Sequence, residues 1–181
     1  MSVLIVIVAM LVLFIPQIAL HEGSHAFMGK RYGLLVDEFR FWPGMVDGKL
    51  KMGYVRFESS SIVLPGEQRA HIAIAPMVLT STLFIVAIVA VQVVPGWPAY
   101  LLLALALNNA IDGTYNSGRL AFMAQHEDLT RNNDTLKWVR YETLGLPWGR
   151  ATAALWITSV WLSVAAVVVT KWFPDMGFNL E

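Results

Sequence analysis

Three long stretches of the chain are almost purely apolar, and a fourth is apolar over its first part. Residues 3–20 and 72–94 contain no charged side chain, and residues 151–172 contain only Lys171. Because about 20 apolar residues span the hydrocarbon core of a bilayer, each stretch predicts a membrane-spanning helix. The fourth, residues 99–112, is apolar up to Leu107 and polar beyond it. We therefore predict an all-α polytopic membrane protein with about four transmembrane helices.

Turn signals and loop charges give these helices an order and an orientation. Residues 95–98, Pro-Gly-Trp-Pro, predict a tight turn that makes the second and third spans an antiparallel helical hairpin. Basic residues are concentrated in the two long connections, whereas the hairpin turn has none. By the positive-inside rule, both long loops are expected to be cytoplasmic and both termini to lie on the other side. No cleavage motif follows the first span, so we expect it to be retained.

The two long loops contain predicted structure of their own. Residues 36–57 are β-prone and partly alternating around the turn signal Asp47-Gly48, which predicts a β-hairpin against the cytoplasmic membrane face. In the second loop, Asp134 is a candidate cap of a short interfacial amphipathic helix, with a solvated linker as the alternative. The predicted division of the chain is a core of residues 1–125, a cytoplasmic loop of residues 126–150, and a further span with a short tail in residues 151–181.

Composition narrows the class of protein. Of 181 residues, 56% are hydrophobic and only 14% are charged, whereas a soluble domain carries about 25% charged residues. An ordinary soluble enzyme is therefore excluded. The 13 basic and 13 acidic residues cancel, so nothing in the charge balance suggests a nucleic-acid partner. Because the chain has no cysteine, a disulfide framework, a thiolate zinc site and a cysteine nucleophile are excluded as well.

The inner end of the first span carries the strongest chemical signal. His21-Glu22-Gly23-Ser24-His25 is an H-E-x-x-H sequence. Residues four apart share one face of a helix, so His21 and His25 are candidate ligands of one zinc ion, and Glu22 is the candidate base that takes a proton from water. The alternative is a chance occurrence. Ionisable residues cost roughly 2.5–3.5 kcal/mol each near a bilayer centre, which argues against placement without a function.

A catalytic zinc usually has a third protein ligand, and Asp112 is our candidate. The first and third spans are parallel, and at 1.5 Å per residue His21 and Asp112 lie about 27 and 21 Å from the outer ends of their helices, so they can meet. Asn108 and Asn109 are candidates to orient a ligand or hold a substrate, with a purely structural role as the alternative. The other candidate third ligands are His71, His126, Glu127 and Asp128.

Together these segments resemble the site-2 protease family of intramembrane zinc metalloproteases. The matching pieces are HEGSHAFMGKRYG at 21–33, the predicted hairpin, IAPMVLT at 74–80 and NNAIDG at 108–113. Their order and spacing match over about residues 1–125. The resemblance implies that His21, His25 and Asp112 bind Zn²⁺, that Glu22 is the general base, and that the enzyme cleaves a peptide bond within or next to a membrane-spanning segment.

The expected partners are the lipid bilayer and a membrane protein substrate, which pairs in extended form with the edge of the 36–57 hairpin. Where the family usually carries Gly before the proline and Asn three residues after it, this chain has Ala75 and Leu79, and Leu103 and Ala104 replace an upstream Asn-Pro pair. These departures motivate an alternative, in which the chain is a non-catalytic membrane relative that acts as a binding or assembly subunit.

Overall fold

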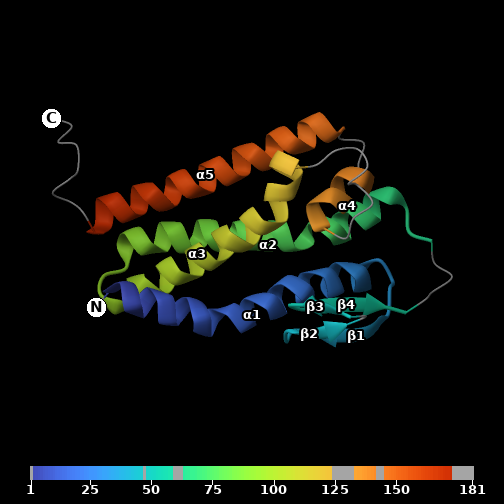
Figure 1. Cartoon of the computed structure of the whole chain (residues 1–181), viewed down its shortest axis with the longest axis horizontal. Helices are drawn as coiled ribbons and strands as arrows, with labels where there is room; N and C mark the ends of the chain where they lie inside the picture. Colours follow the sequence, from blue (N-terminus) through green and yellow to red (C-terminus); the bar gives the residue numbers. More distant parts are fainter. Residues whose placement is uncertain (1, 47, 59–62, 124–132, 142–144, 173–181) are drawn as a thin grey trace.

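The computed structural model describes residues 2–46, 48–58, 63–123, 133–141 and 145–172. Four long helices run roughly alongside one another (Figure 1): α1 (Ser2–Arg31), α2 (Gly66–Val93), α3 (Trp97–Gly118) and α5 (Leu146–Trp172). The N-terminal end of α1, the α2–α3 turn and the C-terminal end of α5 lie at one end of the bundle. The small sheet and the short helix α4 lie at the other.

The predicted helical hairpin is confirmed. Only three residues separate α2 from α3, and Gly96 within this turn has a φ of 72°, a left-handed conformation that glycine adopts without steric cost. Pro98 follows at the start of α3, where its missing N–H group would be unpaired in any case. Pro16 and Pro76 lie inside α1 and α2, as membrane helices tolerate.

Within the described residues, three helices are long and apolar enough to cross a membrane, namely α1, α2 and α5. Helix α3 is not among them, because polar residues interrupt its second half. Four of its polar side chains are turned into the protein: Asn108, Asn109, Asn116 and Ser117 are all buried. Helix α3 packs against each of the other three long helices, so it forms the centre of the bundle.

Apolar contacts hold this arrangement together at two levels beside α3. Near the α2–α3 turn, Leu103 and Ala104 of α3 pack with Val6 of α1, Val91 of α2 and Val167 of α5. In the middle of the bundle, Ala106 and Ala110 of α3 meet Phe84 of α2 and Val160 of α5. The small side chains on α3 allow the neighbouring helices to approach it closely, as is typical of helix packing in membranes.

The predicted β-hairpin is confirmed as two short antiparallel ladders. Strand β1 (Val36–Arg40) pairs with β4 (Tyr54–Phe57), and β2 (Gly44–Val46) pairs with β3 (Lys49–Lys51). The hairpin lies against the second half of α1. A Cβ atom on Gly29 would overlap the Phe57 ring, and one on Gly53 would lie 2.6 Å from Ile18 and 2.9 Å from Glu22. These two glycines therefore allow the hairpin to reach α1 beside the H-E-x-x-H sequence.

The predicted short helix in the second loop is confirmed as α4 (Asp134–Tyr141). It is docked on the bundle rather than solvated, because Leu136 is fully buried and Val139 nearly so. The capping side chain differs from the prediction: Asn133, one residue before Asp134, accepts a hydrogen bond from the Leu136 amide at 3.2 Å. The side chain of Asp134 is thereby left available for other contacts.

Candidate metal centre

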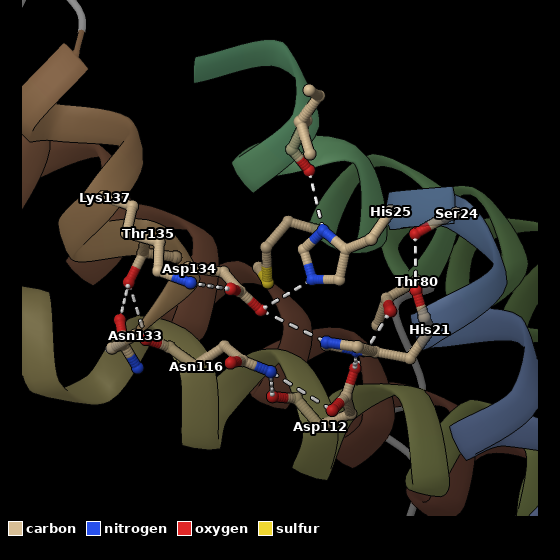
Figure 2. Close-up of polar contacts among 12 residues, drawn as sticks. His21, Ser24, His25, Thr80, Asp112, Asn116, Asn133, Asp134, Thr135 and Lys137 are labelled. Carbon is tan, nitrogen blue, oxygen red and sulfur yellow. Dashed lines mark hydrogen bonds and ion pairs between the residues drawn. The ribbon is translucent and has the colours of Figure 1, made fainter. Parts of the chain in front are cut away.

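Two histidines of α1 and one aspartate of α4 converge at the end of the bundle where the hairpin lies. His21 and His25 are one helical turn apart, and the Nε2 atom of each lies 3.2 Å from the same oxygen, Oδ2 of Asp134 (Figure 2). All three potential ligand atoms lie within 4.8 Å of one another. Within the described ranges, this is the cluster of histidine and carboxylate groups with the spacing that a metal ion requires.

The opposite nitrogen of each imidazole is held by an acceptor. His25 Nδ1 lies 2.7 Å from the backbone oxygen of Ile72, and His21 Nδ1 lies 3.2 Å from Oδ2 of Asp112. A carbonyl oxygen can only accept, so Nδ1 of His25 must carry the proton. In the neutral imidazole, its Nε2 lone pair then points at the Asp134 carboxylate. Two lone pairs and an anionic oxygen facing one point are the donor set that suits a zinc ion.

Asp112 is held in a network on the other side of His21. Besides the His21 contact, its Oδ2 atom accepts a hydrogen bond from Thr80 of α2 at 3.1 Å, and its Oδ1 atom accepts one from Asn116 at 3.2 Å. Asn116 is tied in turn to α4, because its backbone oxygen accepts a 2.6 Å bond from Thr135. The network therefore connects all the helices that surround the histidines.

Asp134 is the first residue of α4, where the unpaired amide groups of a helix N-terminus favour a negative charge. Burial acts to raise the pKa of this carboxyl, but hydrogen bonds from His21 and His25, made when their Nε2 atoms carry protons in the absence of a metal, outweigh it and hold the pKa far below its usual range. Lys137, one turn later on α4, lies 3.6 Å from the second carboxylate oxygen. Asp134 is thus ionised at neutral pH, as a metal ligand must be.

A cavity of about 1250 Å³ opens beside the cluster. Glu22, His21, His25, Asp112 and Asp134 all line it, as do strand β4 and part of α3. Glu22 is therefore in the wall of the same cavity as the three potential ligands. A space of this size admits an extended peptide segment next to them.

The structure brings His21, Glu22, His25 and Asp112 together, as the sequence predicts, and adds Asp134. It places His71 elsewhere: the Nδ1 atom of His71 is 2.6 Å from the hydroxyl of Tyr32. His126, Glu127 and Asp128 lie outside the described residues.

The two predicted asparagines have different places. Asn108 lines the cavity and donates a 2.9 Å hydrogen bond to the backbone oxygen of Met10, which links α3 to α1. Asn109 is fully buried and donates to the backbone oxygen of Leu105 in its own helix.

Asp134 is the residue that the sequence-based reasoning missed. The sequence Asn-Asn-Asp before a short amphipathic segment predicts a helix cap, and this explanation left no reason to consider a ligand. The expected membrane topology could have indicated Asp134 as a candidate ligand. The second long loop is expected on the same side of the membrane as the H-E-x-x-H sequence, so every carboxylate in it belongs among the candidates.

Comparisons with protein-family models, with curated proteins and with solved structures found no match for this chain. Its functional interpretation therefore depends on the site itself.

Proposed function

We propose that the chain is a membrane-embedded zinc endopeptidase of the site-2 protease type, in which His21, His25 and Asp134 hold the metal. The observation that carries the proposal is the convergence of the two Nε2 atoms and one carboxylate oxygen at the inner end of an apolar helix. In this assignment Asp112 is a positioning residue: it accepts the Nδ1 proton of His21 and so turns Nε2 toward the metal.

A zinc ion bound there would lower the pKa of water toward neutrality and polarise the scissile carbonyl. Glu22 is the residue that moves protons. Its carboxylate takes a proton from the attacking water and delivers it to the amine of the departing peptide. Lys137 lies beside the Asp134 carboxylate and Thr80 donates to Asp112, and these contacts keep the two carboxylates oriented.

The proposal includes a membrane disposition. Helices α1, α2 and α5 span the bilayer, and α3 spans it at the centre of the bundle, where its neighbours shield its asparagines from lipid. The hairpin and α4 lie at the basic, cytoplasmic end, and both termini lie at the opposite end. Water then reaches the cluster from the cytoplasm through the cavity.

The substrate is proposed to be a membrane protein whose helix unwinds near the scissile bond. Helical peptide bonds are shielded by their own hydrogen bonds, so an extended conformation is needed for attack. Strand β4 supports this mode of binding. It pairs with β1 along one edge, and its residues 54–57 line the cavity beside Glu22. A substrate strand added to β4 would pass the metal cluster.

The test uses purified protein in liposomes with a reporter whose polyleucine span carries a central Asn-Pro-Gly break between two soluble tags. We expect the wild type to cut it. We expect Glu22→Gln to retain about one zinc per chain and to lose cleavage by at least 10²-fold, the lower bound for a general base. Glu67→Gln, at an exposed position in the first turn of α2, is the matched control and should cut normally. An intact reporter with the wild type, or equal cutting by Glu22→Gln, would contradict the proposal.

A further inference from the structure

Gln17 is a polar side chain of α1 that the proposed reaction leaves unexplained. Its side-chain nitrogen and oxygen are both buried, and neither has a hydrogen-bond partner within the described part of the chain. The residue nevertheless lines the large cavity, together with Phe14, Ile18 and Asn108. A buried amide without partners costs about 1–3 kcal/mol in proteins, so its presence in an apolar span calls for a partner that the free chain lacks.

The position of Gln17 relates it directly to the metal cluster. It precedes His21 by four residues, and Asn108 precedes Asp112 by four residues on the facing helix. Each carboxamide therefore lies one turn, about 6 Å, farther from the cytoplasmic end than the His21–Asp112 contact and on the same face of its helix. Both residues line the cavity one turn beyond the His21–Asp112 contact, and the amide atoms of Gln17 lie buried behind its surface.

The chemistry of a carboxamide indicates which partner is missing. It offers two N–H donors and a carbonyl acceptor, the same groups that one peptide unit presents. A substrate segment that is extended in the cavity displaces the water there, so its backbone groups must find their partners in the protein. The extended substrate backbone and the Gln17 carboxamide can then form hydrogen bonds with each other. A helical substrate cannot bind the carboxamide in this way, because its backbone groups are already paired within the helix.

We propose that Gln17 is a substrate-positioning residue whose carboxamide binds the backbone of the extended peptide on the membrane-interior side of the scissile bond. This inference rests on the proposed endopeptidase function and extends it. The subsite recognises unwound backbone rather than particular side chains, so it selects substrates by the ease with which their helix opens.

The experiment measures peptide binding and stability separately. The inactive Glu22→Gln chain, loaded with zinc in detergent, is titrated with a fluorescent lysine-flanked polyleucine peptide that carries a central Asn-Pro-Gly break. Adding Gln17→Leu should weaken binding about tenfold, and Gln92→Leu, an exposed position at the far end of α2, should not. In active chains, Gln17→Leu should raise KM while zinc content stays the same.

The stability measurement separates a substrate contact from an internal one. If Gln17 lacks a partner in the free protein, Gln17→Leu has an equal or higher Tm than its parent, because an unpaired amide has been removed. A Tm several degrees lower would show an internal partner and overturn the inference, as would unchanged peptide affinity. If the chain with Gln17 intact does not bind the peptide, both the endopeptidase proposal and this subsite fail. If it binds and only the Gln17 effect is missing, the subsite alone fails.

Discussion

The roles assigned to the two aspartates predict that they respond very differently to the same substitution. Asp134→Asn replaces a charged ligand oxygen that both Nε2 atoms face at 3.2 Å. Asp112→Asn leaves all three proposed ligands in place and changes only the acceptor of the His21 Nδ1 proton. The asparagine oxygen can still accept that proton and the Thr80 hydrogen bond, although the NH₂ group that replaces Oδ1 can no longer accept the bond from Asn116.

The expected magnitudes follow from this difference. Protein zinc sites bind with about 10–16 kcal/mol, so one of three protein ligands accounts for roughly 3–5 kcal/mol. At 1.4 kcal/mol per factor of ten, Asp134→Asn should weaken zinc binding by about 10²–10⁴-fold. The loss of a group that orients a ligating histidine costs about 10–100-fold, and Asp112→Asn should fall at or below the lower end of that range.

The assay is a competition titration of zinc between the detergent-solubilised protein and a fluorescent chelator, with far-UV circular dichroism to confirm that each variant is folded. His21→Ala serves as the positive reference for loss of a ligand. The assignment of Asp134 as the third ligand is wrong if Asp112→Asn loses more zinc affinity than Asp134→Asn. That result would make Asp112 the third ligand, as the sequence resemblance implies, and Asp134 a residue that only orients the histidines.

Three further predictions concern the helices and the hairpin. Gly113→Ala should lower stability by about 1–3 kcal/mol, because the new methyl group would overlap the Trp156 ring. Gly118→Ala on the same helix meets open space and is the control, and an equal Tm for both variants would contradict this. Lys171→Met should lower the Tm by several degrees, because the Nζ atom donates to the backbone oxygens of Val91 and Val94 at the C-terminal end of α2, at 2.6 and 3.0 Å. Lys30→Met is the exposed control. A hydrogen bond from the Tyr54 hydroxyl lowers the pKa of Glu38 below 4.5, so the ionised form stabilises the hairpin above that pH and the effect disappears as the pH falls through the folded pKa. Amide protection of β1 and β4 should therefore decrease on acidification in the wild type, and an equal decrease in Glu38→Gln would refute this contribution.

The helical part of the fold could be predicted because bilayer thickness and backbone hydrogen bonding leave few choices for long apolar segments. The predicted spans 3–20 and 151–172 lie within helices, the predicted span 72–94 overruns the end of α2 by one residue, and the turn at 95–98 joins antiparallel neighbours. Helix α3 shows where composition alone is insufficient. Its polar half does not resemble a span, and its place at the centre of the bundle follows from which helices surround it rather than from its own sequence.

The site could be predicted in part, because two of its residues are set by local helix geometry. The spacing of His21 and His25 is local and places both imidazoles on one face of a helix, whereas the third carboxylate comes from a tertiary contact. Depth along parallel helices brings Asp112 to His21, and the two do touch. Asp134 reaches the other ring nitrogen of His21, Nε2, only because α4 docks on the bundle through Leu136 and Val139. No periodic pattern in the sequence predicts that tertiary contact.

The most direct test of the central claim is mass spectrometry of the liposome reporter after incubation in H₂¹⁸O. We expect two fragments whose new ends lie inside the polyleucine span or next to it, with one ¹⁸O atom incorporated at the new carboxyl end. The products should appear with the zinc-loaded wild type and be lost with Glu22→Gln. Fragments that end in the soluble tags, or span cleavage that Glu22→Gln performs equally well, would contradict it.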